Sequence, residues 1–296
     1  MKKGLIVTLI IVLVVSLFSG CSSSLATDNG KRAILVVSFG TSYNDSRALT
    51  IEATENRIKD EFPDYDIFRA FTSQIIIDKL KNRDNLDINN VLQAMEQLKK
   101  DKYSEVYIQP LHVINGEEYN DLLNQANNYK DSFNTLRIGK PLLSSTEDYQ
   151  KAIDALKDKF SNLEKNEAVV FMGHGTPHIA NAQYSELSYM LHDEGYSNVF
   201  VGTVEGYPTI DNVISRLNEK NIEKVTLMPF MLVAGDHANN DMAGDESDSW
   251  KTILKKDGFE VTTYIHGLGE VKGIQDLYVE HLRNLIDGLY EPEENK

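Results

Sequence analysis

The 296-residue sequence contains only one cysteine, Cys21, and one tryptophan. A single cysteine forms no intrachain disulfide, so the fold must be stable without one. Positive charge is scarce as well: 30 Lys and Arg stand against 45 Asp and Glu, a formal net charge of -15. Nucleic-acid binding therefore has little electrostatic support, and an anionic ligand would need local basic side chains or backbone N–H groups. Neither an HExxH motif nor paired cysteines occur, which argues against a hydrolytic or structural zinc site.

The long apolar run of the chain is confined to its N-terminus. Residues 1–20 read MKKGLIVTLIIVLVVSLFSG, in which two lysines, an apolar stretch and small residues follow one another as in a secretory signal. The segment LFSGC resembles the lipobox of bacterial lipoproteins, with Phe18 where leucine is usual. We expect Cys21 to be lipidated and residues 21–31 to form a flexible tether. The alternative is an uncleaved membrane anchor, and both place the folded part outside the cytoplasm.

Beyond the tether, strand-like and helix-like segments alternate, and the pattern occurs twice. AILVVSFGT matches AVVFMGHGT, and EVYIQPLHVINGEE matches KVTLMPFMLVAGDH, without gaps in either pair. These segments lie at 33–41, 168–176, 105–118 and 224–237. Two further pairs of segments match in the same order, which indicates an internal duplication.

Alternating strands and helices predict parallel sheets with helices on both faces. We therefore predict an α/β fold of two similar halves, 32–145 and 146–290, each with one parallel sheet. Ligands of parallel α/β sheets bind at the carboxyl ends of the strands. We expect these ends to face each other across a central cleft.

The two halves differ at their strand ends. Phe39 in the first half aligns with His174 in the second, and Glu118 aligns with His237. Both histidines follow a predicted buried strand, close to glycines that allow the chain to turn. Two imidazoles and a carboxylate suit a divalent ion such as Co²⁺, Ni²⁺, Fe²⁺ or Zn²⁺. A neutral imidazole can also accept a proton, which makes these residues candidates for both metal binding and base catalysis.

The remaining histidines are weaker candidates for a site. We expect His112 to be a hydrogen-bonded core residue, and His192 and His281 to lie at the surface. His178 and His266 are candidates for the cleft wall.

Six segments taken together resemble a known family of enzymes. They are LVVSFGTSYNDSR, FRAFTSQIIIDKL, QPLHVINGEEY, VFMGHGTPH, VEGYP and LMPFMLVAGDHANNDMAGDESDSWK. This set is similar to the anaerobic-type sirohydrochlorin cobaltochelatases of cobalamin synthesis, class II chelatases with ferrochelatase as a structural relative. The likeness covers about residues 32–286. It implies two chelatase-like (ferrochelatase-type) α/β domains around a tetrapyrrole cleft and insertion of Co²⁺ into sirohydrochlorin, or its relative precorrin-2, without ATP.

The resemblance also implies roles for individual residues. The metal-site histidines of the family fall on His174 and His237, its metal-site glutamate falls on Glu118, and Glu205 of VEGYP is a further cleft residue. On this basis His174 is the expected proton acceptor from a pyrrole N–H, with Glu118 or Glu205 as acceptor of the second proton.

The carboxylates of the pigment need partners on an acidic protein. We expect the segment at the start of the first long helix to offer backbone N–H groups to one of them. The candidate substrate-binding residues are Phe39, Gly40, Thr41, Ser42, Arg69 and Glu205, with Arg47 as a further candidate. Plain surface positions would suit the two arginines equally. The acids of NNDMAGDESDSW fit a solvated loop before the next helix better than a second metal-gathering surface.

An export signal is unusual for an enzyme whose pigment is made in the cytoplasm. The alternative function is therefore a lipid-anchored protein outside the cytoplasm that binds metal, haem or another tetrapyrrole without turnover. A solute-binding lipoprotein of a transporter would share the two-lobed shape but would not need the two histidines. Ni²⁺ or Fe²⁺ could replace Co²⁺ at such ligands. A homo-oligomer is possible.

Overall fold

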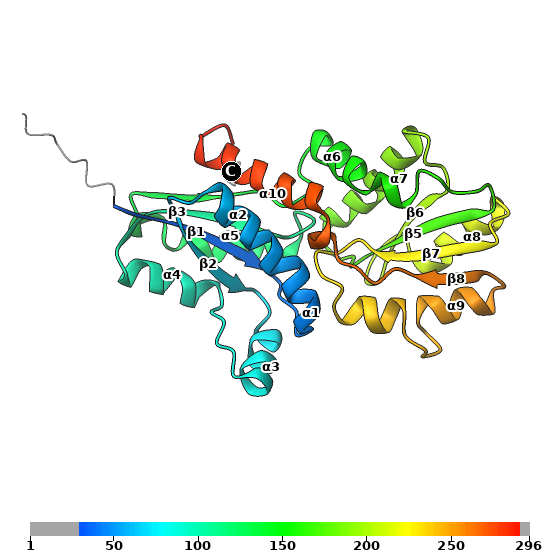
Figure 1. Ribbon diagram of the computed structural model, residues 1–296, viewed down its shortest axis with the longest axis horizontal. Coiled ribbons are helices and arrows are strands. Elements are labelled where there is room, and N and C mark those ends of the chain that lie inside the picture. Colours follow the sequence, from blue (N-terminus) through cyan, green and yellow to red (C-terminus); the bar gives the residue numbers. More distant parts are fainter. Residues whose placement is uncertain (1–29, 291–296) are drawn as a thin grey trace, which may run out of the picture.

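The computed structural model describes residues 30–290 (Figure 1). The predicted signal at 1–20, the candidate lipidation site Cys21 and most of the predicted tether lie outside these residues. The described chain forms two four-stranded parallel sheets with strand orders β2-β1-β3-β4 and β6-β5-β7-β8. The same order in both halves is what a duplication produces, and the predicted α/β fold with one parallel sheet per half is confirmed.

All strands are short, and the two middle strands of each sheet correspond to the segments that matched in the sequence. The strands are β1 (Lys31–Ser38), β2 (Asp66–Phe71), β3 (Tyr103–Pro110), β4 (Thr135–Ile138), β5 (Glu167–Gly173), β6 (Val199–Thr203), β7 (Lys224–Pro229) and β8 (Glu260–Thr263).

Helices lie on both faces of each sheet, as Figure 1 shows. They are α1 (Asn44–Arg47), α2 (Ala53–Glu61), α3 (Gln74–Asp84), α4 (Val91–Lys100), α5 (Glu117–Asn127), α6 (Thr146–Leu156), α7 (Ala182–Asp193), α8 (Ile210–Glu219), α9 (Trp250–Lys256) and α10 (Lys272–Ile286).

Strand β1 shows why a middle strand reads as an unbroken apolar run. Its residues from Ala33 to Ser38 are all buried, because helices cover both faces of the sheet. Leu35 and Val37 belong to the core on one face, whereas Ile34 and Val36 belong to the core on the other. The buried strand thus fixes the positions of Phe39 and Gly40 at the carboxyl end of β1.

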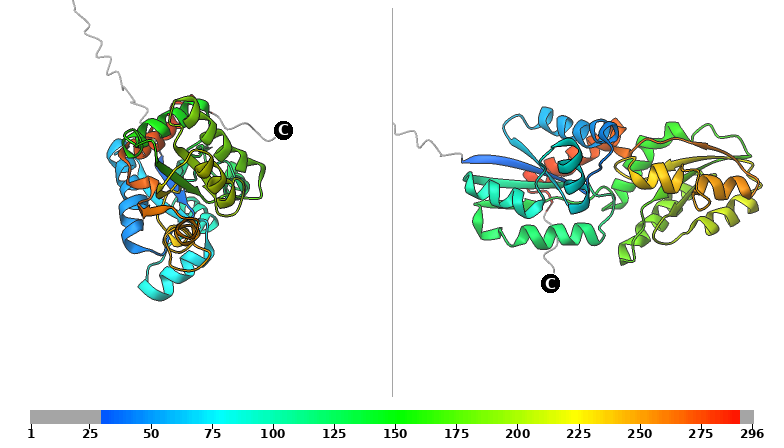
Figure 2. Two further views of the ribbon diagram at one scale, coloured as in Figure 1. Left: turned by 90° about the vertical axis from the view of Figure 1, so that its right-hand side faces the viewer. Right: turned by 90° about the horizontal axis from the view of Figure 1, so that it is seen from below.

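The two lobes lie end to end along the long axis of the molecule (Figure 2). Helix α10 belongs to the second half of the sequence, yet it packs against α2 and β3 of the first lobe as well as against α6. The hydroxyl of Tyr278 on α10 donates to the carbonyl of Leu111 at the end of β3, over 3.0 Å. One apolar core includes residues of β1, β5, α7 and α10, so it runs through both lobes.

The prediction that His281 is a surface residue is wrong. Its side chain is only 2% exposed, because both lobes pack on α10 and cover most of the surface of this helix. The ring Nε2 of His281 lies 2.8 Å from Oδ1 of Asp148 on α6, and the Lys140 ammonium donates to Oδ2 of the same carboxylate over 2.7 Å. This buried group of three side chains ties α10 to the start of the second lobe.

The charges of this group follow from its surroundings. Burial alone raises the pKa of the Asp148 carboxyl, but hydrogen bonds from His281 and Lys140 outweigh burial, and the pKa lies well below its ordinary value of 3.8. Burial lowers the pKa of His281, against the opposing effect of Asp148. At neutral pH the group is therefore a carboxylate that accepts from a neutral imidazole and an ammonium.

Within residues 30–290, no helix is both long and apolar enough to cross a membrane.

The substitution Asp148→Asn should lower the free energy of unfolding by about 3 kcal/mol at pH 7, because it leaves Lys140 without its buried partner. Urea unfolding followed by circular dichroism measures this. The matched control is Asp154→Asn on the same helix, whose carboxylate is half exposed and pairs with Lys157 at 3.6 Å. The control should change stability by no more than about 0.5 kcal/mol.

The wild type and Asp148→Asn also allow a test of the pH dependence of stability. A depressed carboxyl pKa stabilises the folded state above the unfolded pKa and loses that effect as pH falls through the folded value. The stability gap between the wild type and Asp148→Asn should thus be full above about pH 5 and shrink below it. A gap that is the same at pH 7 and pH 3 would contradict this assignment.

Candidate metal centre

A cavity of about 530 Å³ lies between the two lobes. Most of its wall comes from the segments that follow the four middle strands: 39–43 after β1, 111–121 after β3, 174–177 after β5 and 231–237 after β7. These are the carboxyl ends of parallel strands, where ligands of such sheets bind. The duplication therefore places matching segments of the two lobes around one shared cavity.

Three side chains of the second lobe converge in this cavity. One ligand atom from each of His174, Glu205 and His237 can be chosen so that all three lie within 4.8 Å of one another. The two imidazole rings meet edge to face, with centroids 4.7 Å apart and an interplanar angle of 88°. The side chains are 43%, 54% and 31% exposed in that order. Such a cluster can hold a divalent ion and still leave coordination positions open.

Gly175 brings His174 and Glu205 together. It follows β5 with a φ of +81°, and a Cβ there would lie 2.6 Å from the backbone nitrogen of Gly206. A residue with a side chain would be strained by this φ and would push the two loops apart. With glycine, the backbone N–H of Glu205 donates to the carbonyl of His174 over 2.8 Å. The imidazole and the carboxylate thus emerge next to each other, with Nδ1 of His174 3.9 Å from Oε2 of Glu205.

Each histidine of the cluster has its Nδ1 engaged elsewhere. Nδ1 of His174 lies 2.8 Å from the carbonyl oxygen of Gly175, and Nδ1 of His237 lies 2.5 Å from Oδ2 of Asp241. A carbonyl or a carboxylate can only accept, so in the neutral rings Nδ1 carries the proton. The lone pair of Nε2 is then free on both rings, and Nε2 is the atom that each offers to a metal ion.

Glu118 lies in the same cavity but outside the cluster of three. It is the second residue of α5 in the first lobe, and its Oε2 accepts a hydrogen bond of 2.7 Å from the hydroxyl of Thr72. The sequence predicted Glu118 as the metal-binding carboxylate and Glu205 as a cleft residue. In the structure Glu205 is the carboxylate beside the histidines, and the role of Glu118 stays a prediction.

The candidate substrate-binding residues divide into two groups. Phe39, Gly40, Thr41 and Ser42 line the cavity, and Phe39 is 46% exposed there. Arg69 is not among the lining residues.

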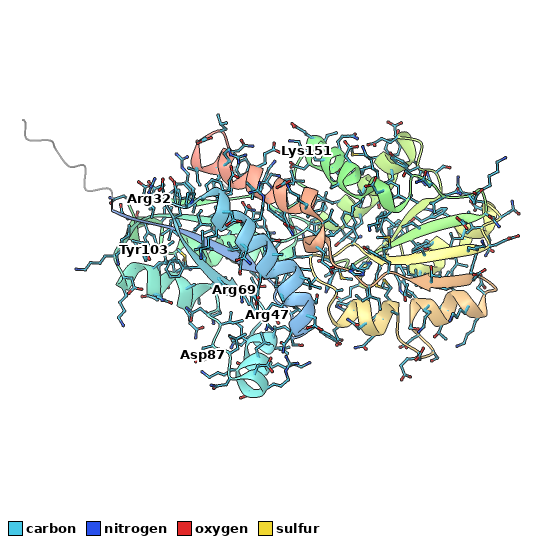
Figure 3. All side chains as sticks on the ribbon, in the orientation of Figure 1. Arg32, Arg47, Arg69, Asp87, Tyr103 and Lys151 are labelled. Carbon is cyan, nitrogen blue, oxygen red and sulfur yellow. The ribbon has the colours of Figure 1, made fainter. Side chains whose placement is uncertain are left out.

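Both arginines are held by acids on the helix that follows β1. The guanidinium of Arg69 pairs with Glu55 and Glu52, and that of Arg47 pairs with Glu52 and donates to Asn44. Both arginines lie in the first lobe (Figure 3). This placement gives no support to the prediction that Arg69 binds substrate, because its fork of donors is already taken by two carboxylates.

His112 differs from its prediction in part. It is partly buried and forms part of the cavity wall, and burial of its ring lowers its pKa to about 4. Within residues 30–290, however, neither of its ring nitrogens has a hydrogen-bond partner, although a hydrogen-bonded core histidine was predicted.

The two cleft candidates among the other histidines lie outside the cavity wall. His266 pairs with Glu270 at 2.7 Å on the surface. His178 lies beside the cavity, where its Nε2 is 3.1 Å from the side-chain amide of Asn120 in the other lobe.

The cavity wall is acidic. Among the described residues that line it there are five carboxylates and neither lysine nor arginine. The carboxylates are Glu117, Glu118, Asp121, Glu205 and Asp236. Such a wall attracts a cation and repels the acidic groups of a ligand.

Comparison with known proteins agrees with this geometry. Residues 32–287 match the family described as "Cobalt chelatase (CbiK)". The chain belongs to this family. The sirohydrochlorin cobaltochelatase of Salmonella typhimurium is 44% identical to this chain over 257 residues, which cover 87% of this chain and 97% of that protein. Sirohydrochlorin cobaltochelatase CbiKC of Nitratidesulfovibrio vulgaris is 33% identical over 262 residues, with 88% and 92% coverage.

Solved structures with low sequence identity share the fold of this chain. SirB from Bacillus subtilis with Fe³⁺ superposes with a TM-score of 0.60 at 17% identity, covering 88% of this chain and 99% of that one. CbiX, described as the terminal enzyme of sirohaem biosynthesis in denitrifying bacteria, superposes with a TM-score of 0.52 at 17% identity, with 85% and 98% coverage. The predicted chelatase-like architecture is therefore confirmed at the level of the fold.

Two substitutions distinguish the carboxylates of the cavity. Glu205→Gln should weaken Co²⁺ binding more than about 100-fold, beyond the range for groups that only support a ligand. Glu118→Gln should weaken it less than about 10-fold, since Glu118 lies outside the cluster. Isothermal titration of the metal-free protein with CoCl₂ measures both. Equal losses would place both carboxylates on the ion, and the reverse order would make Glu118 the ligand.

Proposed function

We propose that this protein inserts Co²⁺ into sirohydrochlorin without ATP, as a sirohydrochlorin cobaltochelatase (EC 4.99.1.3). The observation that carries the proposal is the cluster of His174, Glu205 and His237 in the cavity between the duplicated lobes of a cobalt chelatase family member. In the reaction, one Co²⁺ enters the macrocycle and two pyrrole N–H protons leave it. The site must therefore supply ligands for the metal and proton acceptors close to the pyrrole nitrogens that lose their protons.

The ligand set fits the substrate metal. Two imidazole nitrogens and a carboxylate oxygen bind borderline divalent ions without the rigid demands of an all-oxygen site. Three protein ligands leave open positions, into which the pyrrole nitrogens can enter as Co²⁺ moves to the ring. Ni²⁺ and Fe²⁺ suit the same donors, so which metal ion is inserted depends on the supply of these ions as well as on the ligands of the site.

His174 can serve first as a ligand and then as a base. Its Nδ1 donates to the carbonyl of Gly175, so a single lone pair, on Nε2, is available to the cavity. That lone pair binds Co²⁺ before transfer and becomes free when the ion moves into the macrocycle. It can then accept a pyrrole proton, and a positioned base of this kind accelerates a reaction by about 10²- to 10⁴-fold. Glu205, 3.9 Å from the ring of His174, is the acceptor we propose for the second proton.

Apolar side chains of the first lobe fit the face of a flat pigment. This lobe contributes Phe39, Ile76, Leu111, Val113 and Ile114 to the cavity, together with the acids Glu117, Glu118 and Asp121. Phe39 occupies the position that His174 has in the second lobe, so the duplicated strand ends supply an aromatic ring on one side and a metal ligand on the other. A macrocycle between them packs one face on apolar side chains and turns the other to Co²⁺.

The many carboxylates of sirohydrochlorin have to lie at the mouth of this cavity. Its described wall contains five acids and neither lysine nor arginine, so a carboxylate inside would be both desolvated and repelled. Backbone N–H groups around Gly40, Thr41 and Ser42 are the partners we propose at the rim, as expected from the sequence.

One spectroscopic assay tests the activity. The purified domain is mixed with sirohydrochlorin and Co²⁺, and the visible spectrum is followed. Many equivalents of metallated product per protein support the enzyme, whereas a change that stops at one equivalent supports the alternative, a binder without turnover. His174→Ala and His237→Ala should each lower the turnover number at least about 100-fold with an unchanged circular dichroism spectrum. Full rates in both variants would refute the assignment.

We further propose that the chain is exported and held at the outer side of the membrane by a lipid on Cys21. Support comes from the sequence alone: a charged start, an apolar run and the segment LFSGC. A role outside the cytoplasm would couple this chelatase to pigment or metal that is present there.

Replacing the cysteine tests the anchor. Expressed in its natural host, the wild-type protein should sediment with membranes and incorporate a labelled fatty acid. Cys21→Ser should lose the label and, if the signal is then cleaved by another peptidase, become soluble. A labelled Cys21→Ser protein, or an unlabelled wild-type protein, would contradict lipidation at this residue.

A further inference from the structure

The two histidines of the metal cluster have different supporting groups. Nδ1 of His237 lies 2.5 Å from a carboxylate oxygen of Asp241, whereas Nδ1 of His174 lies 2.8 Å from the carbonyl oxygen of Gly175. A metal-binding histidine that donates its other N–H to a carboxylate is fixed in its tautomer and orientation and is a stronger donor to the metal. A neutral carbonyl fixes the tautomer with less effect on the donor strength of the ring.

We propose that Asp241 is a positioning residue that makes His237 the anchoring ligand of the incoming Co²⁺, whereas His174, supported only by a backbone carbonyl, is the ligand released during transfer. The inference rests on the proposed function and divides its two histidines by task. His237 keeps the ion in the cavity until the macrocycle is in place, and His174 leaves first and becomes available to a pyrrole proton.

Asp241 is free to act on His237 because the local chain does not depend on it. The turn after β7 is held by its backbone and by two asparagines: Asn239 donates to the carbonyls of Ala234 and Gly235, and Asn240 donates to Asp236. Among the described hydrogen bonds, the side chain of Asp241 takes part in one, with His237. Its side chain is 45% exposed and is therefore not enclosed in the core.

The duplication supplies a second observation. The gap-free match between the halves pairs His237 with Glu118, and continued by four residues it pairs Asp241 with Leu122. Leu122 is fully buried in the core of the first lobe. The fold that the two halves share therefore does not require an acid at this position. The acid occurs in the half that has a histidine four residues earlier.

The tautomer explains why a carboxylate is needed. As an acceptor only, Asp241 holds the proton on Nδ1 and leaves the Nε2 lone pair to the metal. An asparagine can turn its amide and donate to Nδ1, which moves the proton to Nε2 and blocks the metal-binding atom. Asp241→Asn, almost identical in size, should thus lose the function of the carboxylate without loss of volume.

The experiment compares Asp241→Asn with Asp248→Asn, which removes the same charge from an exposed residue of the following loop. Co²⁺ binding to the metal-free protein is measured by isothermal titration, without any tetrapyrrole. Asp241→Asn should raise the dissociation constant about 10- to 100-fold, and Asp248→Asn less than about 2-fold. In turnover, Asp241→Asn should raise KM for Co²⁺ by a similar factor and leave kcat at saturating Co²⁺ within about 3-fold.

Nitrogen-15 NMR of the histidine rings supplies a readout that a merely structural role would not change. The wild type and Asp248→Asn should show His237 protonated on Nδ1, and Asp241→Asn should show a substantial fraction protonated on Nε2. Unchanged Co²⁺ affinity in Asp241→Asn, equal losses in both variants, or an unchanged tautomer would overturn the proposal.

Failure of the proposed function is distinguishable from failure of this inference. A protein that binds Co²⁺ through His237 but never metallates sirohydrochlorin would still show the affinity loss and the tautomer change. In such a protein Asp241 would still position His237, but no turnover of sirohydrochlorin would be observed.

Discussion

The structure depends on one apolar core that runs through both lobes and fixes the angle at which their strand ends face each other. Residues of β1, β5, α7 and α10 share this core, and the buried contact of His281 with Asp148 adds a polar tie between α10 and α6. Two sheets joined only by a linker would move independently, since interfaces between domains are usually small and polar. Here the shared core holds the metal ligands of one lobe against the cavity wall of the other.

Duplication gave the molecule two equivalent sets of strand ends, which carry different chemistry. The position after β1 is the aromatic Phe39, and the matching position after β5 is the metal ligand candidate His174. In the proposed function the two lobes divide the work of a chelation site, with Phe39 against the pigment on one lobe and a ligand set for the ion on the other. Both lobes contribute acids to the cavity wall, which favours a cation and repels the charged edge of a tetrapyrrole.

Much of this could be predicted from the sequence, since buried strands read as apolar runs and the duplication is visible in matched segments. The histidines of the cluster were also identified, because each comes after such a strand, with a glycine one or two residues away. Contacts between distant segments were not accessible: His281 was expected at the surface because nothing in α10 reveals that two lobes cover it. Asp241 was assigned to a solvated loop, although its spacing of four residues from His237 was a usable signal. The pairing of Arg69 with Glu55 depends on how a helix packs over β2.

The return of α10 to the first lobe has a consequence for how the chain matures. Domains made first on the ribosome generally fold first. Here the first lobe lacks part of its core until residues 272–286 have been synthesised, because Tyr278 and its neighbours fill the space beside β3. The cavity between the lobes is therefore complete only after α10 has been made, because the core that holds the two lobes together includes this helix. The last helix to be synthesised thus completes the lobe that was synthesised first.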